Sequence, residues 1–338
     1  MARFPEIPGH KIVSELGEGG MATVYLGIQE KLDREVAIKI LKPFLLKDTV
    51  TAARFEREAQ TAASLSHSNI IQIFDTGKYG NYHYIIMEYL QESLKDHMKR
   101  TQQGKMHPQI ALDIVEAIMK ALDYAHFRGV YHRDIKPDNI MFRQDSTPVL
   151  VDFGIARVFE SLEELTQIGI FMGTPNYMSP EQCNSQPVDG RSDIYSLGVV
   201  FFEMLTGKRP YEGTGMMQVA FKHVNEPVPT LPQALSSYQP LIEKMMAIER
   251  QKRLSSGAQF VQLLDRIMMG SITPQRQPVN SSAVSPVEAS SSEPPGDHSN
   301  TTTVKILNLK PSAPSKEKKS FFFKFLDLIK KKLDSFIN

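Results

Sequence analysis

The first quarter of the chain alternates apolar and polar residues in short runs, which is the pattern of half-buried β-strands. β-branched and aliphatic residues fill these runs, and turn-forming Gly and Asp separate them. A segment with the spacing of a helix, residues 50–65, follows the third run. The strand-like runs lie at residues 11–16, 22–28, 35–41, 70–75 and 82–89. The three early runs predict an antiparallel sheet.

From about residue 90 onward the apolar positions recur at the spacing of helices instead. Pro108 suits the first turn of a helix, and apolar residues then continue at helical spacing up to Gly129, where the helix is expected to stop. A strand-rich first third and a helix-rich remainder predict an α+β fold with two lobes: a small antiparallel sheet with one helix, and a larger, mostly helical lobe.

The composition changes near residue 272. Residues 271–316 are rich in Pro, Ser, Thr, Asn and Gln and predict a disordered linker, because such a segment buries too little apolar surface to offset its ordering entropy. Residues 310–338 then carry eight Lys and three acidic residues, hence +5, against −4 for the rest. Residues 317–338 have the spacing of a basic amphipathic helix. It could lie on an anionic membrane, in a partner's groove or on the chain's own surface.

Overall composition excludes several classes of protein. The 338 residues are 41% hydrophobic, and 39 Lys and Arg balance 38 Asp and Glu, so no nucleic-acid partner is expected. The single cysteine, Cys183, cannot form an internal disulfide, and no Cys/His spacing suits zinc. Neither a signal peptide nor a transmembrane run is recognisable, so we expect a cytoplasmic protein, with peripheral contact at the inner face of the membrane left open.

A glycine-rich segment lies between the first two predicted strands. Glycines let backbone N–H groups approach phosphate oxygens closely, and the strand-to-strand context argues against a dinucleotide-binding fold. Taken alone, an ordinary hairpin explains it equally well. The segment consists of Gly17, Glu18, Gly19, Gly20, Met21, Ala22, Thr23 and Val24.

Lys39 follows in the apolar run Val36-Ala37-Ile38-Lys39 of the third strand. Burying a lysine in such a strand is costly unless the ammonium meets an anion, such as a phosphate or the carboxylate of Glu58 in the following helix. By itself, Lys39 could equally be a solvent-facing residue of an edge strand.

The third signal is the most specific. It comprises His132-Arg133-Asp134-Ile135-Lys136-Pro137-Asp138-Asn139 and, thirteen residues after Asn139, Asp152-Phe153-Gly154. With these four ordered motifs, residues 10–270 resemble the eukaryotic-type (Hanks-type) protein kinases, and in particular the bacterial serine/threonine kinases. The resemblance implies the two-lobed protein kinase fold, with an N-lobe at about residues 10–88 and a C-lobe at about residues 91–270.

The resemblance also assigns catalytic roles. Asp134 would orient the attacking hydroxyl, Lys136 would contact the γ-phosphate, and Lys39, fixed by Glu58, would hold the α- and β-phosphates of ATP. Asn139 and Asp152 would bind Mg²⁺, with Mn²⁺ as an alternative.

The same resemblance places the adenine between the two lobes. Leu16 and Val24 would cover it, Ala37 would line its pocket, and Met87 would stand at the gatekeeper position. Glu88 and Leu90 would offer backbone hydrogen bonds. Ala22 replaces the third glycine of the family's loop, which leaves the close backbone approach at Gly17 and Gly19 intact.

Substrate choice and regulation follow from further family positions. Lys136 and Thr174, in Gly173-Thr174-Pro175, favour serine or threonine over tyrosine as acceptor. Arg133 next to Asp134 would receive a phosphate on the activation loop, for which Thr166 is the predicted autophosphorylation site, helped by self-association. Alternatively, a loop carboxylate balances Arg133.

Two competing functions come from other classes. A pseudokinase scaffold would bind partners without turnover, but such proteins commonly lack one of Lys39, Asp134, Asn139 or Asp152, which are all present. A kinase of small molecules or lipids would have little use for the peptide-binding signature at residues 173–181. We therefore expect an enzyme that phosphorylates proteins.

Overall fold

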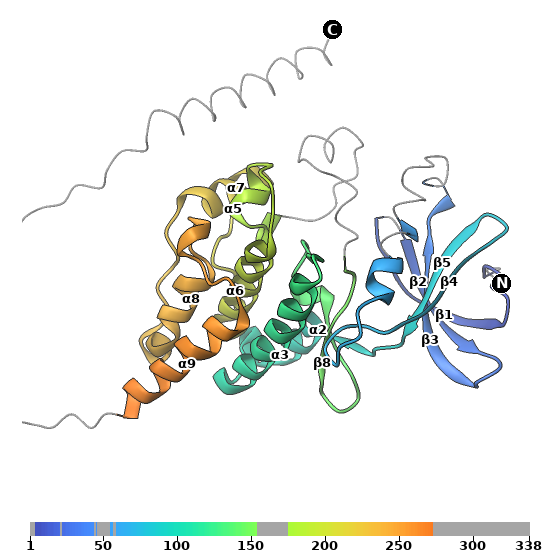
Figure 1. Ribbon diagram of the computed structural model, residues 1–338, viewed down its shortest axis with the longest axis horizontal. Coiled ribbons are helices and arrows are strands. Elements are labelled where there is room, and N and C mark those ends of the chain that lie inside the picture. Colours follow the sequence, from blue (N-terminus) through green and yellow to red (C-terminus); the bar gives the residue numbers. More distant parts are fainter. Residues whose placement is uncertain are drawn as a thin grey trace, which may run out of the picture. The chain divides into compact units, whose positions relative to one another are not determined.

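The structure is a computed structural model that describes residues 4–20, 22–43, 45, 55–56, 59–153 and 175–272. Of residues 270–272 it describes the backbone only. Residues 1–275 form one compact unit, and residues 276–338 are assigned to a second. The elements, labelled in Figure 1 where there is room, are β1(His10–Glu18), β2(Ala22–Gln29), β3(Arg34–Leu41), β4(Ile73–Tyr79), β5(Tyr82–Glu88), β6(Glu92–Ser93), α2(Leu94–Arg100), α3(Pro108–Phe127), β7(Ile140–Phe142), β8(Pro148–Leu150), α5(Pro180–Cys183), α6(Gly190–Thr206), α7(Met216–Asn225), α8(Gln239–Met245) and α9(Gly257–Ile272).

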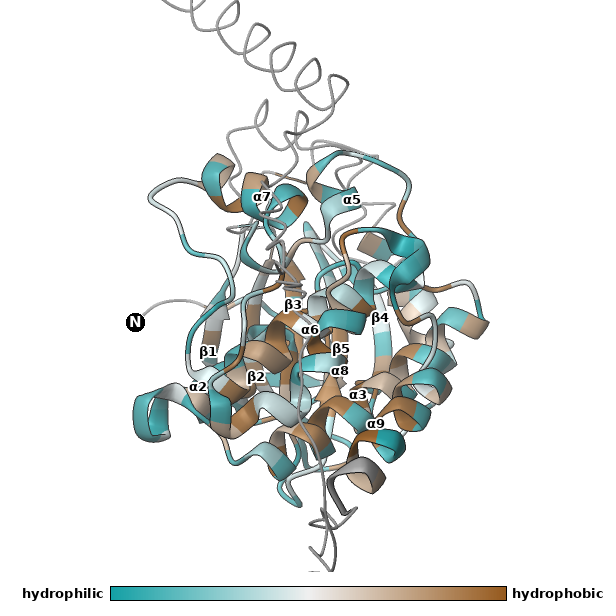
Figure 2. Cartoon of the chain, turned by 90° about the vertical axis from the view of Figure 1, so that its left-hand side faces the viewer, coloured by the Kyte–Doolittle hydropathy of each residue, from teal (hydrophilic) through white to brown (hydrophobic). Residues whose placement is uncertain are grey.

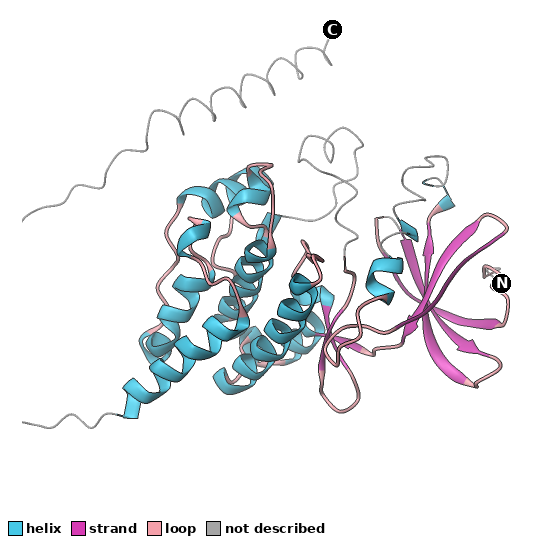
Figure 3. Ribbon diagram, in the orientation of Figure 1, coloured by secondary structure: helices cyan, strands magenta, loops and turns pink. Residues whose placement is uncertain are grey.

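The first five strands form one antiparallel sheet in the order β1-β2-β3-β5-β4 (Figure 3). The predicted antiparallel sheet is therefore confirmed. β4 begins at Ile73, later than the expected residue 70, because Ile70 forms a parallel bridge with Leu150 and the Ile71 amide donates to the Leu150 carbonyl. β3 is the central strand, and six of its eight residues are buried.

The helical part is built around α6. Thirteen of its seventeen residues are buried, as expected of a helix that is apolar on all sides. Asp189 caps its first turn, and Gly207 ends it in the left-handed conformation with φ +71°. Burying a side chain such as Phe201 contributes roughly 1.5–3 kcal/mol, so α6 anchors this core.

Helix α3 packs against both α6 and α9. Pro108 occupies its first turn, and Gly129, with φ +72°, lies just past its end at Phe127, close to the predicted bounds. Helices α3 and α9 each alternate hydrophobic and hydrophilic residues, which Figure 2 shows in brown and teal. Nine hydrophobic residues of α3 are buried in the core, whereas Ile110 and Phe127, near its two ends, are exposed.

The short hairpin of β7 and β8 joins the helical core to the large sheet. Its residues Val149 and Val151 pack with Ala37 of β3 and with Met87 and Leu90 at the end of β5, in one apolar cluster. The segments that precede β7 and follow β8 are those that carry the catalytic motifs. The hairpin thus brings the two groups of sequence motifs together.

Candidate active site

The catalytic segment runs from His132 to Asn139, directly before β7. The Lys136 ammonium donates to the Asp134 carboxylate at 2.6 Å. The amide nitrogen of Asn139 donates to the backbone carbonyl of Asp134 at 2.8 Å and to its carboxylate at 3.0 Å. Asp134 keeps 42% of its side chain exposed. The aspartate is therefore oriented by two neighbours while remaining accessible to an incoming hydroxyl group.

Helix α6 holds this segment in place through the carboxylate of its buried residue Asp193. Its two carboxylate oxygens accept the backbone amides of His132 and Arg133, at 2.9 and 2.6 Å. His126, at the end of α3, lies 2.8 Å from the same carboxylate, so it is a structural neighbour of the catalytic segment. Arg133 has φ +68°, a conformation that costs about 1–3 kcal/mol. The hydrogen bond from its backbone N–H to Asp193 offsets that cost.

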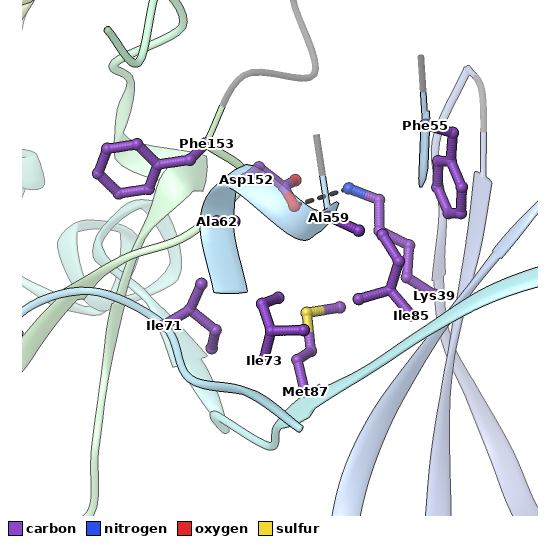
Figure 4. A pocket seen from close by; sticks show the side chains of 10 residues that line it. All are labelled: Lys39, Phe55, Ala59, Ala62, Ile71, Ile73, Ile85, Met87, Asp152 and Phe153. Atoms are coloured by element: carbon purple, nitrogen blue, oxygen red, sulfur yellow. Dashed lines mark hydrogen bonds and ion pairs between the residues drawn. The ribbon is translucent and has the colours of Figure 1, made fainter. Parts of the chain in front are cut away.

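Lys39 and Asp152 form an ion pair with 2.6 Å between Nζ and Oδ1 (Figure 4). Lys39 lies in β3 and is buried, whereas Asp152 follows β8. Burial would raise the pKa of the Asp152 carboxyl, but the charge and hydrogen bond of Lys39 outweigh burial and lower this pKa. The Asp152 carboxyl is therefore ionised at neutral pH, next to the place expected for the phosphates.

A small, mostly apolar cavity lies behind this ion pair. Figure 4 shows Met87 and Ile85 from β5, Ile73 from β4 and Phe55 arranged around it. Phe153, the residue after Asp152, also lines it, and its ring packs edge-on against His132 at a centroid distance of 4.8 Å. Met87 lines this cavity and also belongs to the apolar cluster that includes Ala37 and Leu90.

The residues expected around the adenine lie together as an apolar cluster. Ala37, Met87 and Leu90 are buried in it, and Val24 packs against it. Leu16 is 44% exposed at the end of β1. Sequence reasoning did not single out Met141 and Val151, which complete this cluster from the hairpin. Their positions, two residues after Asn139 and one before Asp152, could have suggested them.

Glu88 also makes a contact that sequence reasoning missed. Its carboxylate receives two hydrogen bonds from the guanidinium of Arg143, at 2.5 and 2.9 Å, and Arg143 additionally donates to the Ser68 carbonyl. Arg143 directly follows β7. The side chain of Glu88 is therefore engaged by Arg143, which leaves the expected contact with adenine to the backbone of Glu88.

The segment after residue 174 is tied to the catalytic segment and to α6. Ser179 and Gln182 form a capping box at the start of α5, and the Gln182 amide group also donates to the Arg133 carbonyl at 2.7 Å. Glu181 and Arg253 form a buried ion pair at 2.7 Å. Sequence reasoning missed Gln182, although its spacing from Ser179 matches the capping box.

The donor set suits a magnesium site that is completed by a nucleotide. Among the described residues, no three or more His, Cys, Asp and Glu side chains form a metal-binding group. Asp152 and Asn139 instead supply a carboxylate and an amide oxygen, and the Val151 amide donates to the Asn139 carbonyl at 2.9 Å. Mg²⁺ commonly takes only one or two protein ligands and fills its shell with phosphates and water.

Several predicted residues lie outside the described part of the chain. They are Met21, Glu58, Thr166, Thr174 and the whole segment 273–338. Among the described residues, no helix is both long enough and apolar enough to cross a bilayer.

The fold and this arrangement of side chains define the class of protein. A family model for the protein kinase domain matches residues 10–265, and the chain belongs to this family.

Its relatives are bacterial. The chain is 42% identical over 219 residues to the serine/threonine-protein kinase PknB of Mycobacterium leprae, covering 63% of this chain and 35% of that protein. It is also 42% identical over 222 residues to the serine/threonine-protein kinase PrkC of Bacillus subtilis, covering 65% and 34%. The crystal structure of the PknI kinase domain of Mycobacterium tuberculosis superposes with a TM-score of 0.62 at 27% identity, covering 79% of this chain and 100% of that domain. The chain thus spans about a third of the length of these curated relatives.

Proposed function

We propose that this chain transfers the γ-phosphate of ATP to serine or threonine hydroxyls of proteins. One observation carries the proposal. Asp134, Lys136 and Asn139 are bonded to one another, while Asp152, next to the strand that follows them, is paired with Lys39. The relatives, which are named as serine/threonine-protein kinases, support the same reaction and acceptor type.

In this reaction Asp134 accepts a hydrogen bond from the acceptor hydroxyl and takes its proton as the oxygen attacks phosphorus. Lys136, already within 2.6 Å of Asp134, stabilises the negative charge on the transferred phosphoryl group. Lys39, whose Nζ lies 2.6 Å from Asp152, binds the α- and β-phosphates. Phosphoryl transfer depends on such positioning and charge neutralisation more than on covalent catalysis.

Asp152 and Asn139 are proposed to hold Mg²⁺, for which Mn²⁺ could substitute. When bound, the metal would neutralise charge on the phosphates. Asp152 is suited to this role because it stays ionised at neutral pH, its pKa being lowered by Lys39 against the effect of burial. ATP itself is proposed to lie against the cluster of Ala37, Met87 and Leu90.

The first test is the variant Asp134→Asn, assayed with radiolabelled ATP, Mg²⁺ and a generic basic protein. We expect phosphoryl transfer to fall by about 10²–10⁴-fold, because a positioned general base contributes about that much. Asp138→Asn is the matched control, since Asp138 lies in the same segment but pairs with the exposed Lys95. Label on tyrosine in the wild-type chain would reject the proposal. So would the absence of any label in a wild-type chain that still binds ATP, and this second result would favour a scaffold.

Regulation is proposed to act through the activation loop. Arg133, held at its backbone by Asp193 and Gln182, would bind a phosphate on Thr166, added by a second copy of the chain during transient self-association. Mass spectrometry of the protein after incubation with ATP tests this. Phosphate at Ser161 in place of Thr166 would reject the assignment.

The basic segment 317–338 is proposed to contact anionic membranes. Its sequence supports this, since residues 310–338 carry eight Lys and three acidic residues. Co-sedimentation with vesicles of phosphatidylcholine, with and without phosphatidylserine, distinguishes this contact from docking onto a protein. Equal sedimentation with both vesicles would reject an electrostatic contact.

A further inference from the structure

A buried polar chain in the helical part connects α7 to the segment that follows the activation loop. His223, in the last turn of α7, has no exposed surface. Its Nδ1 lies 2.9 Å from the Tyr195 hydroxyl, and its Nε2 lies 3.1 Å from the backbone carbonyl of Asn176. Asn176 comes two residues after Thr174, inside the stretch 173–181 that resembles the family's peptide-binding signature.

The partners of His223 determine its protonation. A carbonyl oxygen can only accept, so Nε2 carries the hydrogen and donates it to Asn176, while Nδ1 accepts from the Tyr195 hydroxyl. Burial lowers the pKa of His223 to about 4, which keeps the imidazole neutral at physiological pH. The rings of Tyr211 and Tyr195 pack edge-on against it, at 4.9 and 5.7 Å. The imidazole therefore has one orientation and one tautomer.

The rest of this segment is held to α6 at neighbouring points. The Ser196 hydroxyl donates to the Tyr177 carbonyl at 2.6 Å, and the Tyr177 hydroxyl donates to Glu203 at 2.7 Å. Arg253, the partner of Glu181, lies over the Tyr195 ring at 4.9 Å. Helix α7 contacts both α5 and the turn at residues 175–177, and that turn contacts α6. Among these side-chain contacts, only that of His223 comes from α7.

We propose that His223 is a positioning residue for the protein acceptor, fixing the backbone at Asn176 so that the acceptor chain meets a preformed surface. The inference rests on the proposed phosphorylation of proteins. The inference goes beyond that proposed function because it assigns a role in acceptor binding, rather than in ATP binding or catalysis, to a residue of α7. Lys39 and Asp134 make no contact with the imidazole in any of the interactions described above. An effect of His223 on acceptor binding can therefore be separated from an effect on ATP binding or catalysis.

The test is a steady-state comparison of the full chain with His223→Phe, using myelin basic protein as the acceptor. Phe keeps the ring between Tyr195 and Tyr211 but cannot donate to Asn176. We expect KM for the acceptor to rise about tenfold, the size expected when a buried carbonyl loses its donor, and KM for ATP to stay within about twofold. His223→Gln, whose amide can donate to the same carbonyl, should restore most of the difference.

Tyr211→Phe is the matched control. Its hydroxyl bonds to the carbonyls of Glu226 and Pro227, so the variant loses a part-buried polar group beside the same imidazole without touching Asn176. Hydrogen exchange of a peptide covering residues 175–181 should be faster in His223→Phe than in Tyr211→Phe.

Two results would overturn the inference: an unchanged acceptor KM in an active His223→Phe, or parallel increases in both KM values with a lower melting temperature. An inactive wild-type chain would instead overturn the proposed function, and the inference with it.

Discussion

At the scale of single residues, the site depends on charged groups whose partners decide their state. Lys39 lowers the pKa of Asp152 although burial acts in the opposite direction, and burial alone lowers that of His223. The first result keeps a proposed metal ligand ionised, and the second keeps a hydrogen-bond donor neutral. Neither could be predicted from the sequence, because both depend on contacts between residues far apart in the chain.

Lys39→Met should change how stability depends on pH. A lowered carboxyl pKa adds stability above the unfolded value of about 3.9, and this stability is lost as pH falls through the folded value. Without Lys39, the Asp152 carboxyl loses the main influence that lowers its pKa, while burial still acts to raise it. The stability difference between wild type and variant should therefore shrink from pH 7 to pH 3, by at most about 1 kcal/mol because solvent screens the pair.

Urea unfolding at several pH values measures this difference. Lys95→Met, which breaks the exposed pair with Asp138, is the control and should show a small change. A difference between wild type and Lys39→Met that stays constant with pH would contradict the pairing of Lys39 with Asp152.

His223 should make the protein acid-sensitive at a milder pH. The unfolded chain takes up a proton below about pH 6.5, whereas the folded chain does so only near pH 4. The unfolded state therefore binds more protons in this window, and stability falls as pH falls, by up to about 3 kcal/mol in total. His223→Gln should flatten this part of the curve. His107→Gln, at an exposed position, should leave it unchanged, and equal curves for His223→Gln and wild type would reject the buried neutral state.

At the scale of elements, helix α6 supports both the segment His132 to Asn139 and the segment that follows the activation loop, at residues 175–177. Asp193, in its first turn, binds two backbone amides of the catalytic segment, and Ser196, Tyr195 and Glu203 engage residues 175–177 directly or through His223. Gly190 allows this packing, since an added Cβ would lie 2.4 Å from the His126 ring. Small and polar residues in a buried helix thus have specific partners here.

Asp193→Asn should weaken this support. An amide group can accept on one side only and presents a donor to the second backbone N–H, which leaves a buried amide unpaired. We expect a loss of about 2 kcal/mol in urea unfolding, together with a lower kcat because Asp134 is displaced. Asp189→Asn, which still caps the same helix, should change both quantities little. Full activity in Asp193→Asn would show that the backbone bonds do not position Asp134.

The sequence was sufficient for those elements that have a strong period or a clear stop. It predicted α3 from Pro108 to the stop at Gly129, and the antiparallel pairing of the early strands. It misplaced the start of β4, because Ile70 and Ile71 have a strand-like composition but pair with Leu150 of the hairpin. Motif spacing pointed to the residues proposed to be catalytic, and the capping-box spacing of Ser179 could have pointed to Gln182. Arg143 and His223 instead make side-chain contacts that no local pattern encodes.

At the scale of the whole molecule, pairs of residues distant in sequence fix how segments meet. Lys39 and Asp152 join β3 to the end of the hairpin, and Arg143 joins Glu88 to the segment containing Ser68. Glu181 and Arg253 join α5 to the segment before α9, and both are almost fully buried. The Ser192 hydroxyl also donates to Glu181, at 2.5 Å. Each of these contacts stabilises the fold only while all its partners are present, because a buried charge without its partner is costly.

Glu181→Ala should therefore be strongly destabilising. It leaves the buried guanidinium of Arg253 without its anion, and such changes typically cost 3–5 kcal/mol. We expect a lower melting temperature and a matching loss in urea unfolding. Glu249→Ala, which removes an exposed partner of Lys252, should cost less than about 1 kcal/mol. Equal effects of the two substitutions would contradict the burial of the Glu181 pair.

The hairpin of β7 and β8 has a mechanical consequence. Asn139 and Asp152 flank it, and the main-chain bond from Val151 to Asn139 closes it between them. The two proposed metal ligands therefore belong to one closed hairpin, whose main chain sets their separation. Lys39 comes from the other sheet and reaches Asp152 only through its side chain. A shift of the large sheet relative to the hairpin would therefore change the hold on the phosphates before it changed the geometry offered to the metal.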